Sequence, residues 1–160
     1  MTFVATDPSS HNSENTWFTP IEFKKLGVFD LDPCTVSYRP HDMAVENFEY
    51  DKEQCGLELA WHGDVWLNPP YGKEITPFIE KFIMHKKGVM LIFARMGNKD
   101  VQKVVKSGAR FYMLRKRIPF IDKNHKKHTN AGADSCLVFY ENKWKDKILS
   151  TFEGVLMSGR

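Results

Sequence analysis

The chain has 160 residues, of which 42% are hydrophobic and 13% aromatic, and its formal net charge is +3. This composition is too apolar for a disordered chain, and no run reaches the roughly 18 apolar residues that a membrane span needs. We therefore expect one domain without a membrane segment. The 3 cysteines stand at no metal-like spacing, which favours reduced thiols and a cytoplasmic protein.

Charge is distributed unevenly along the chain. Residues 1–80 hold 5 Lys and Arg against 14 Asp and Glu, whereas residues 81–160 hold 18 against 6. A basic half of this kind favours a polyanionic partner such as a nucleic acid. The alternative is an ordinary solvated face, and charge alone does not separate the two.

The N-terminal part of the sequence predicts a tail and then a helix. Residues 1–15 are polar and aperiodic, so we expect a flexible tail there and a single folded domain over residues 16–160. The first helix should have about two turns, because Thr19 is a good N-cap, Pro20 suits the first helical position and Glu22 completes a capping box.

Short apolar runs and turn residues predict the remaining elements. Asp32 and the proline after it should end the first strand, and residues 34–63 and 115–133 should be long loops. Thr76 and Asn98 are expected to cap the next two helices. The predicted strands cover residues 28–31, 64–67, 89–93, 111–114, 136–140 and 154–157, and the later helices cover 77–87, 99–106 and 143–149.

The alternation of strands and helices predicts an α/β fold with a mostly parallel central sheet flanked by helices. In such sheets, ligands bind beyond the carboxyl ends of the strands. The turn at residues 30–34 and the loop at residues 68–71 both follow predicted strands. They should therefore lie on the same rim of the sheet.

The sharpest motif is the tetrapeptide Asn68-Pro69-Pro70-Tyr71. Two prolines in sequence fix the backbone and end the strand before them. The side-chain oxygen of Asn68 and the carbonyl oxygen of Pro69 can both accept hydrogen bonds from one exocyclic amino group, and Tyr71 offers a flat face for a base. Drawing the hydrogens of an aromatic amine out of plane returns its lone pair to nitrogen, which suits in-line attack on an activated methyl group.

This tetrapeptide resembles the catalytic motif of amino-methyltransferases that use S-adenosylmethionine. The wider pattern resembles the phage-type DNA N6-adenine methyltransferase (Dam-like) family. The resemblance implies a compact Rossmann-like methyltransferase fold, S-adenosylmethionine as cofactor, double-stranded DNA as substrate, and a phage or prophage origin. It also implies that the target adenine is flipped out of the helix. The matching segments are Trp17–Pro20, Phe29–Cys34, Val65–Gly72, Met90–Arg95, Arg117–Phe120 and Ser135–Tyr140.

The resemblance implies cofactor contacts in two segments. One is the predicted helix start at Thr19, where free N–H groups suit a carboxylate. The other is the turn after the first strand, where Asp30 or Asp32 would face the ribose hydroxyls or the amino group; strand register decides which, and either one can instead be a turn cap. The Gly-rich loop of larger methyltransferase families is not visible at this turn. The expected cofactor-binding residues are Trp17, Thr19, Pro20, Asp30, Asp32, Pro33 and Cys34.

Basic residues near the predicted rim are candidates for the DNA backbone, since cations that neutralise phosphates release condensed counterions. A plain solvated surface is the alternative for each of them. His125 and His128 have no cysteine or carboxylate cluster beside them, so we expect no metal site. The expected nucleic-acid-binding residues are Arg95, Arg115, Lys116, Arg117, Lys123, Lys126 and Lys127.

Two other functions fit the same residues. The tetrapeptide can serve a different amino acceptor, namely adenine in RNA, N4 of cytosine or a glutamine amide in a protein. A nucleic-acid-binding or anti-restriction module that kept the fold and lost turnover is the other alternative. With one domain there is no room for a separate recognition domain, so base reading would come from residues 35–63 and 115–133. A monomer and a dimer both suit the sequence.

Overall fold

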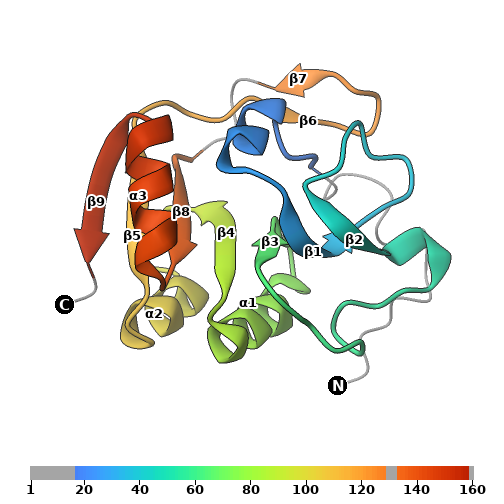
Figure 1. Ribbon diagram of the computed structural model, residues 1–160, viewed down its shortest axis with the longest axis horizontal. Helices are drawn as coiled ribbons and strands as arrows, with labels where there is room; N and C mark the ends of the chain where they lie inside the picture. Colours follow the sequence, from blue (N-terminus) through green and yellow to red (C-terminus); the bar gives the residue numbers. More distant parts are fainter. Residues whose placement is uncertain (1–16, 129–132, 159–160) are drawn as a thin grey trace.

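The computed structural model describes residues 17–128 and 133–158, so the tail expected over residues 1–15 lies outside the described part. Within that part, a 7-stranded sheet has the order β2-β1-β3-β4-β8-β5-β9, and β6 and β7 form a separate hairpin. Figure 1 shows β2 and β9 at opposite ends of the sheet. The strands are β1 (Phe29–Thr35), β2 (Ala44–Glu49), β3 (Val65–Leu67), β4 (Gly88–Phe93), β5 (Arg110–Leu114), β6 (Phe120–Ile121), β7 (Lys127–His128), β8 (Ser135–Phe139) and β9 (Gly154–Ser158).

The sheet is mixed: five of its seven described strands share one direction, in line with the predicted mostly parallel sheet, and β8 and β9 run the other way. β1 pairs in parallel with β2 and β3, and β3 pairs in parallel with β4. β8 lies between β4 and β5 and is antiparallel to both, and β9 is antiparallel to β5. The physical reason is that a hairpin, not a helix, follows β5, so the chain returns from the same rim in the opposite direction. Strands β1 to β5 of the main sheet still share one direction, and their carboxyl ends meet at one rim.

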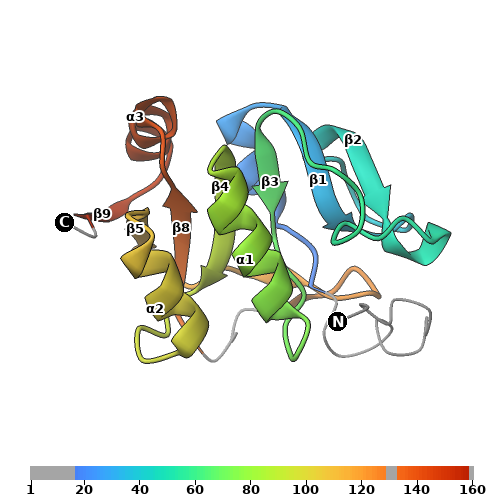
Figure 2. The same cartoon turned by 90° about the horizontal axis from the view of Figure 1, so that it is seen from below.

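Helices cover both faces of the sheet, and Figure 2 shows α1 and α2 on one side and α3 on the other. Alternate strand residues face the two layers: Leu67 packs in the cluster with α1 and α2, and Trp66 packs in the cluster with η1 and α3. Both side chains are fully buried. Strands buried on both faces read as continuous apolar runs, which is why the sequence reveals them. The helices are η1 (Ile21–Leu26), η2 (Tyr50–Lys52), α1 (Ile75–His85), α2 (Lys99–Lys106) and α3 (Asn142–Thr151).

The first two strands differ from the prediction. β1 continues through Asp32 and Pro33 to Thr35. Its pairing with β2 shifts register between Asp32 and Thr35, so Pro33 lies at an irregularity and does not interrupt a regular ladder of hydrogen bonds. β2 lies inside the segment predicted to be a long loop. It is an edge strand in which Ala44 and Phe48 are buried while Val45 and Glu46 between them are exposed, so it lacks an apolar run. Similarly, β6 and β7 lie inside the predicted loop at residues 115–133.

Helix starts also depart in part from the prediction. η1 is a 3₁₀ helix whose N-cap is Pro20, and no side chain caps it, so the capping box of Thr19 and Glu22 does not form. Thr76 lies inside α1 and donates its hydroxyl hydrogen to Asp100 at 2.9 Å instead of capping. In contrast, Asn98 caps α2 as predicted, since its side chain accepts from two backbone N–H groups of the first turn.

We predict that Gly88 is required where α1 enters β4. Its φ is +114°, and an added Cβ would lie 2.0 Å from the carbonyl oxygen of Val65. Gly108 is the matched control, because its φ is +87° but nothing lies within 4 Å of an added Cβ. Urea unfolding should show that Gly108→Ala costs about 1 kcal/mol, from backbone strain alone, and that Gly88→Ala costs about 4 kcal/mol or more. Equal losses in the two variants would contradict the close packing of β3 on β4.

Candidate active site at the carboxyl ends of the strands

A pocket lies at the carboxyl ends of β1 and β3, beside the segment that leads into η1. It brings together residues that are far apart in the sequence, and most of them are ones that the sequence singled out. Of the predicted cofactor and catalytic residues, the pocket is lined by Trp17, Thr19, Asp32, Cys34, Asn68, Pro69 and Pro70. Its other lining residues, which sequence reasoning missed, are Phe18, Thr35, Val36 and Tyr50.

Asn68 is held at the first position after β3 with its amide in a defined orientation. Its Nδ2 donates to the carbonyl oxygen of Trp17 at 2.8 Å and to Oγ1 of Thr19 at 3.2 Å. Its Oδ1 is buried and accepts no hydrogen bond from residues 17–128 or 133–158. An unpaired buried acceptor is costly, typically about 1–3 kcal/mol, and Asn68 combines it with a place in the pocket lining. The side chain therefore presents an acceptor, already desolvated, for a hydrogen-bond donor.

Tyr71 belongs to an aromatic group next to the pocket. Its ring centroid lies 4.6 Å from that of Phe93 and 6.3 Å from that of Phe120, which meets it edge-on. The Tyr71 residue is half-buried, and its hydroxyl is buried without a partner. Burial raises the pKa of this hydroxyl well above its ordinary value, so the phenol stays neutral and does not act as a base.

The two aspartates of β1 occupy different environments. Asp32 is buried and lines the pocket, and its Oδ1 accepts the backbone N–H of Cys34 at 3.1 Å. Asp30 is exposed, and its Oδ2 accepts the backbone N–H of Asp64 at 2.7 Å. The structure thus brings Asp32 to the pocket and leaves Asp30 outside it. Pro33 is buried in β1 but is not among the lining residues.

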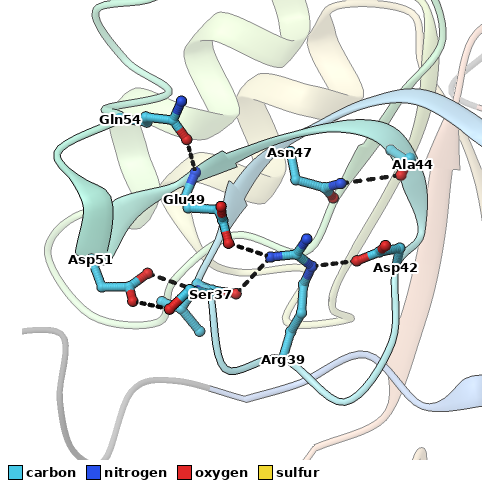
Figure 3. A network of polar contacts seen from close by, with 9 residues as sticks. Ser37, Arg39, Asp42, Ala44, Asn47, Glu49, Asp51 and Gln54 are labelled. Carbon is cyan, nitrogen blue, oxygen red and sulfur yellow. Dashed lines mark hydrogen bonds and ion pairs between the residues drawn. The ribbon is translucent and has the colours of Figure 1, made fainter.

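An ion-pair network supports the wall opposite Asn68. Figure 3 shows Arg39 between Asp42 and Glu49, with nitrogen–oxygen distances of 2.6 Å and 2.7 Å. Arg39 also donates to the carbonyl oxygen of Val36 at 2.9 Å. Because Val36 and Tyr50 line the pocket, this network fixes the loop after β1 against the end of β2. The signal in the sequence was weak, since the charges of this segment are typical of any exposed loop.

The predicted DNA-binding residues lie along the same rim. Arg95 follows β4 and is exposed, with its guanidinium carbon 5.2 Å from the ring centroid of Phe93. It therefore stands beside the aromatic group of Tyr71. Lys123, Lys126 and Lys127 are exposed on the β6–β7 hairpin, which Figure 1 shows at the top of the molecule.

The remaining cations form a second basic patch. Arg115, Lys116 and Arg117 follow β5, are exposed, and border a second pocket that also includes Pro20. Two of them have acidic neighbours, Glu153 at 3.2 Å from Arg115 and Asp134 at 3.3 Å from Arg117. Exposed pairs of this kind contribute little, about 0–1 kcal/mol, so both guanidinium groups can exchange them for phosphate.

The sequence matches one family model. A model described as DNA N-6-adenine-methyltransferase (Dam) matches residues 9–156. The chain belongs to the Dam family. No curated protein and no solved structure matched the chain. The match covers the pocket, the tetrapeptide and both basic patches, so the Dam family assignment applies to the whole described rim.

Metal-ligating side chains, apolar helices and cysteines were further candidates for function in this Dam-family protein. Within residues 17–128 and 133–158, no group of three or more His, Cys, Asp or Glu side chains is placed to hold a metal ion. His128 instead contacts Asp122 at 2.6 Å within the hairpin. None of the helices in the described part has the length and apolar character to cross a membrane. Cys34, half-buried, and the buried Cys55 and Cys136 are free thiols.

We predict that Asp32 makes the stability of this Dam-family protein depend on pH. Burial raises the pKa of Asp32 to about 7, against the opposing effects of the Cys34 N–H and of Arg39. The unfolded chain releases this proton near pH 4 and the folded chain near pH 7, so stability should fall as pH rises across that window. Asp32→Asn keeps an oxygen for the Cys34 N–H and removes the titration.

The check is the melting temperature of the wild type and of Asp32→Asn between about pH 4 and 8. The difference in favour of Asp32→Asn should grow across this range. Asp30→Asn, at an exposed position of the same strand, is the matched control for the loss of a carboxyl from β1. A gap between Asp32→Asn and the wild type that shrinks with rising pH would refute the assignment.

Proposed function

We propose that this protein transfers a methyl group from S-adenosylmethionine to N6 of an adenine in double-stranded DNA. The observation that carries the proposal is the buried, unpaired Oδ1 of Asn68, which borders a pocket together with Pro69. Membership of the Dam family supplies the reaction class and DNA as the substrate. The geometry supports an amino group as the acceptor, because Asn68 and Pro69 at the pocket carry oxygens that accept hydrogen bonds.

The residues of the pocket fit the cofactor. Asp32 is a buried carboxyl whose pKa lies near 7, and it can accept hydrogen bonds from the hydroxyl or amino groups of a bound molecule. Cys34 and the segment Trp17–Pro20 complete the contacts expected for the cofactor, with Pro20 at the edge toward the second pocket. When bound, S-adenosylmethionine supplies a methyl group made electrophilic by its sulfonium.

Asn68 and Pro69 prepare the acceptor nitrogen. Oδ1 of Asn68 and the carbonyl oxygen of Pro69 accept the two hydrogens of N6 and localise its lone pair toward the methyl group. Held in this way, N6 would attack the methyl group with its lone pair, the electron pair of the carbon–sulfur bond would stay on sulfur, and N6 would then release one proton to solvent. Pro70 fixes the backbone, and Tyr71 stacks on the base, which must leave the duplex to reach this position.

The basic patches define a path for the DNA backbone along the rim. Arg95 lies beside the base site, and Lys123, Lys126 and Lys127 extend it over the hairpin. Arg115, Lys116 and Arg117 extend it in the direction of η1. In this proposal these residues contact DNA phosphates and contribute to DNA affinity, and the segments 35–63 and 115–133 read the base sequence.

We predict that Asn68→Ala abolishes methyl transfer. The assay uses labelled S-adenosylmethionine with unmethylated duplex DNA, digestion to nucleosides, and parallel reactions with RNA and protein acceptors. Label should enter N6-methyladenine of DNA and fall at least about 100-fold in Asn68→Ala, as for loss of a group that acts in the transition state. Asn47→Ala is the control, because the Asn47 side chain donates only to the carbonyl oxygen of Ala44 on β2.

Each other result points to a specific revision. Transfer by Asn68→Ala near the wild-type rate would overturn the proposed role of the tetrapeptide. Label in RNA, in N4-methylcytosine or in protein would change the acceptor and keep the chemistry. DNA binding without cofactor binding, measured by calorimetry, would identify an inactive nucleic-acid-binding or anti-restriction module.

We further predict that Lys116 and Arg117 act through phosphate neutralisation. Each substitution to Ala should lower DNA affinity and reduce the slope of log K against log salt by about 1. Lys103→Ala is the control, since Lys103 lies on α2 and pairs with Glu80 of α1 at 2.7 Å, away from the rim. An unchanged slope in Lys116→Ala and Arg117→Ala would remove this patch from the DNA path.

A further inference from the structure

We infer that Trp17 and Thr19 form a clamp that decides which end of the Asn68 amide faces the pocket, and that Thr19 is a positioning residue of the reaction. The inference rests on the proposed function, because it concerns how the site selects the group that it methylates. It also gives the Thr19 hydroxyl a task that differs from helix capping and from cofactor binding.

One half of the clamp, the Trp17 carbonyl, can only accept hydrogen bonds. The carbonyl oxygen of Trp17 lies 2.8 Å from Nδ2 of Asn68, and a carbonyl has no hydrogen to donate. Turning the amide over would place Oδ1 against this oxygen, so two acceptors would face each other in a buried site. The Trp17 carbonyl therefore directs the NH₂ end of Asn68 inward and leaves Oδ1 facing the pocket.

Thr19 supplies the second half of the clamp. Its Oγ1 accepts Nδ2 of Asn68 at 3.2 Å and Nε1 of Trp66 at 3.1 Å. Trp66 is fully buried, and its indole nitrogen can only donate. Both lone pairs of the Thr19 hydroxyl are thus used by N–H donors, and the side chains from β3 are tied to the segment before η1.

The backbone of the clamp is itself anchored to the basic hairpin. Phe18, between the two clamp residues, is buried and pairs with Ile121 of β6 through backbone hydrogen bonds of 2.7 Å and 3.4 Å. The Trp17 ring meets the ring of His128 edge-on at 5.0 Å. The clamp is therefore held on one side by β3 and Asn68 and on the other side by the β6–β7 hairpin, which carries Lys123, Lys126 and Lys127.

The consequence is a selection rule for the acceptor group. With Oδ1 facing the pocket, the site binds a hydrogen-bond donor, as in the amino groups of adenine and cytosine. A carbonyl at the same position, as in guanine or thymine, would meet a second acceptor. A site that leaves buried polar groups unpaired with the wrong ligand discriminates strongly, by a factor of about 10⁴ in favourable cases.

The test compares Thr19→Val, which keeps the shape and removes the acceptor, with Thr19→Ser, which keeps the hydroxyl. The turnover number should fall about tenfold or more in Thr19→Val, and Thr19→Ser should stay within about threefold of the wild type. In Thr19→Val the turnover number should fall by a larger factor than the affinity for S-adenosylmethionine, because the clamp acts on the acceptor side while the segment Trp17–Pro20 also borders the expected cofactor site.

A second readout does not depend on activity. Hydrogen exchange of the Asn68 side-chain amide, followed by NMR in the cofactor-free protein, should be slow in the wild type and in Thr19→Ser and faster in Thr19→Val. Equal exchange in all three proteins would overturn the clamp. So would a loss of cofactor affinity with unchanged turnover in Thr19→Val, which would assign Thr19 to the cofactor. Absence of methyl transfer in the wild type with the predicted exchange pattern would instead refute the proposed function and leave the clamp standing.

Discussion

The candidate site depends on one constraint: the Asn68 amide is held at the end of β3 so that its oxygen stays buried and unpaired among the described residues. Asn68 achieves this because its two N–H groups are taken by Trp17 and Thr19 while Oδ1 accepts no protein hydrogen bond. A buried acceptor that has no hydrogen-bond partner lowers the free energy of unfolding, and other interactions in the fold must offset this cost. The compensation comes from the fully buried apolar residues on either side of β3.

The fold explains why this constraint can be met. β3 is central and paired in parallel on both sides, and its three residues are fully buried between two helical layers. The following Pro69 and Pro70 turn the chain abruptly at the rim, where β1 brings Asp32 and Cys34. The segment Trp17–Thr19 then closes this rim from the side of the β6–β7 hairpin. Segments far apart in the sequence, residues 17–19 and the end of β3, thus meet at a single amide.

Much of this could be predicted from the sequence because apolar runs and proline pairs are local signals. The strands at residues 64–67, 89–93, 111–114 and 136–140 and the Asn98 cap are confirmed to within a residue, and the family assignment is confirmed. β2 was missed because an edge strand with one exposed face reads like a loop. The sequence predicts Thr19 as a helix cap and a cofactor contact, because local sequence cannot show that Trp66 and Asn68 both donate to its hydroxyl.

The sequence also could not decide whether Asp30 or Asp32 faces the pocket. Alternate strand residues face opposite layers, and the sequence alone does not fix which layer holds the pocket. In the structure Asp32 is buried and lines the pocket, whereas Asp30 lies outside it and accepts the N–H of Asp64. Long-range partners, rather than residue types, decide which of several plausible side chains belongs to the site.

The most direct test of the central claim is a structure of the protein with a duplex containing adenine and a cofactor analogue that cannot transfer its methyl group. The account predicts that one extrahelical adenine places N6 within hydrogen-bond distance, about 2.7–3.2 Å, of Oδ1 of Asn68 and of the carbonyl oxygen of Pro69. Nδ2 of Asn68 should still donate to Trp17 and Thr19. A complex in which the amide is reversed, or in which Oδ1 contacts only the cofactor analogue while the base lies elsewhere, would contradict it.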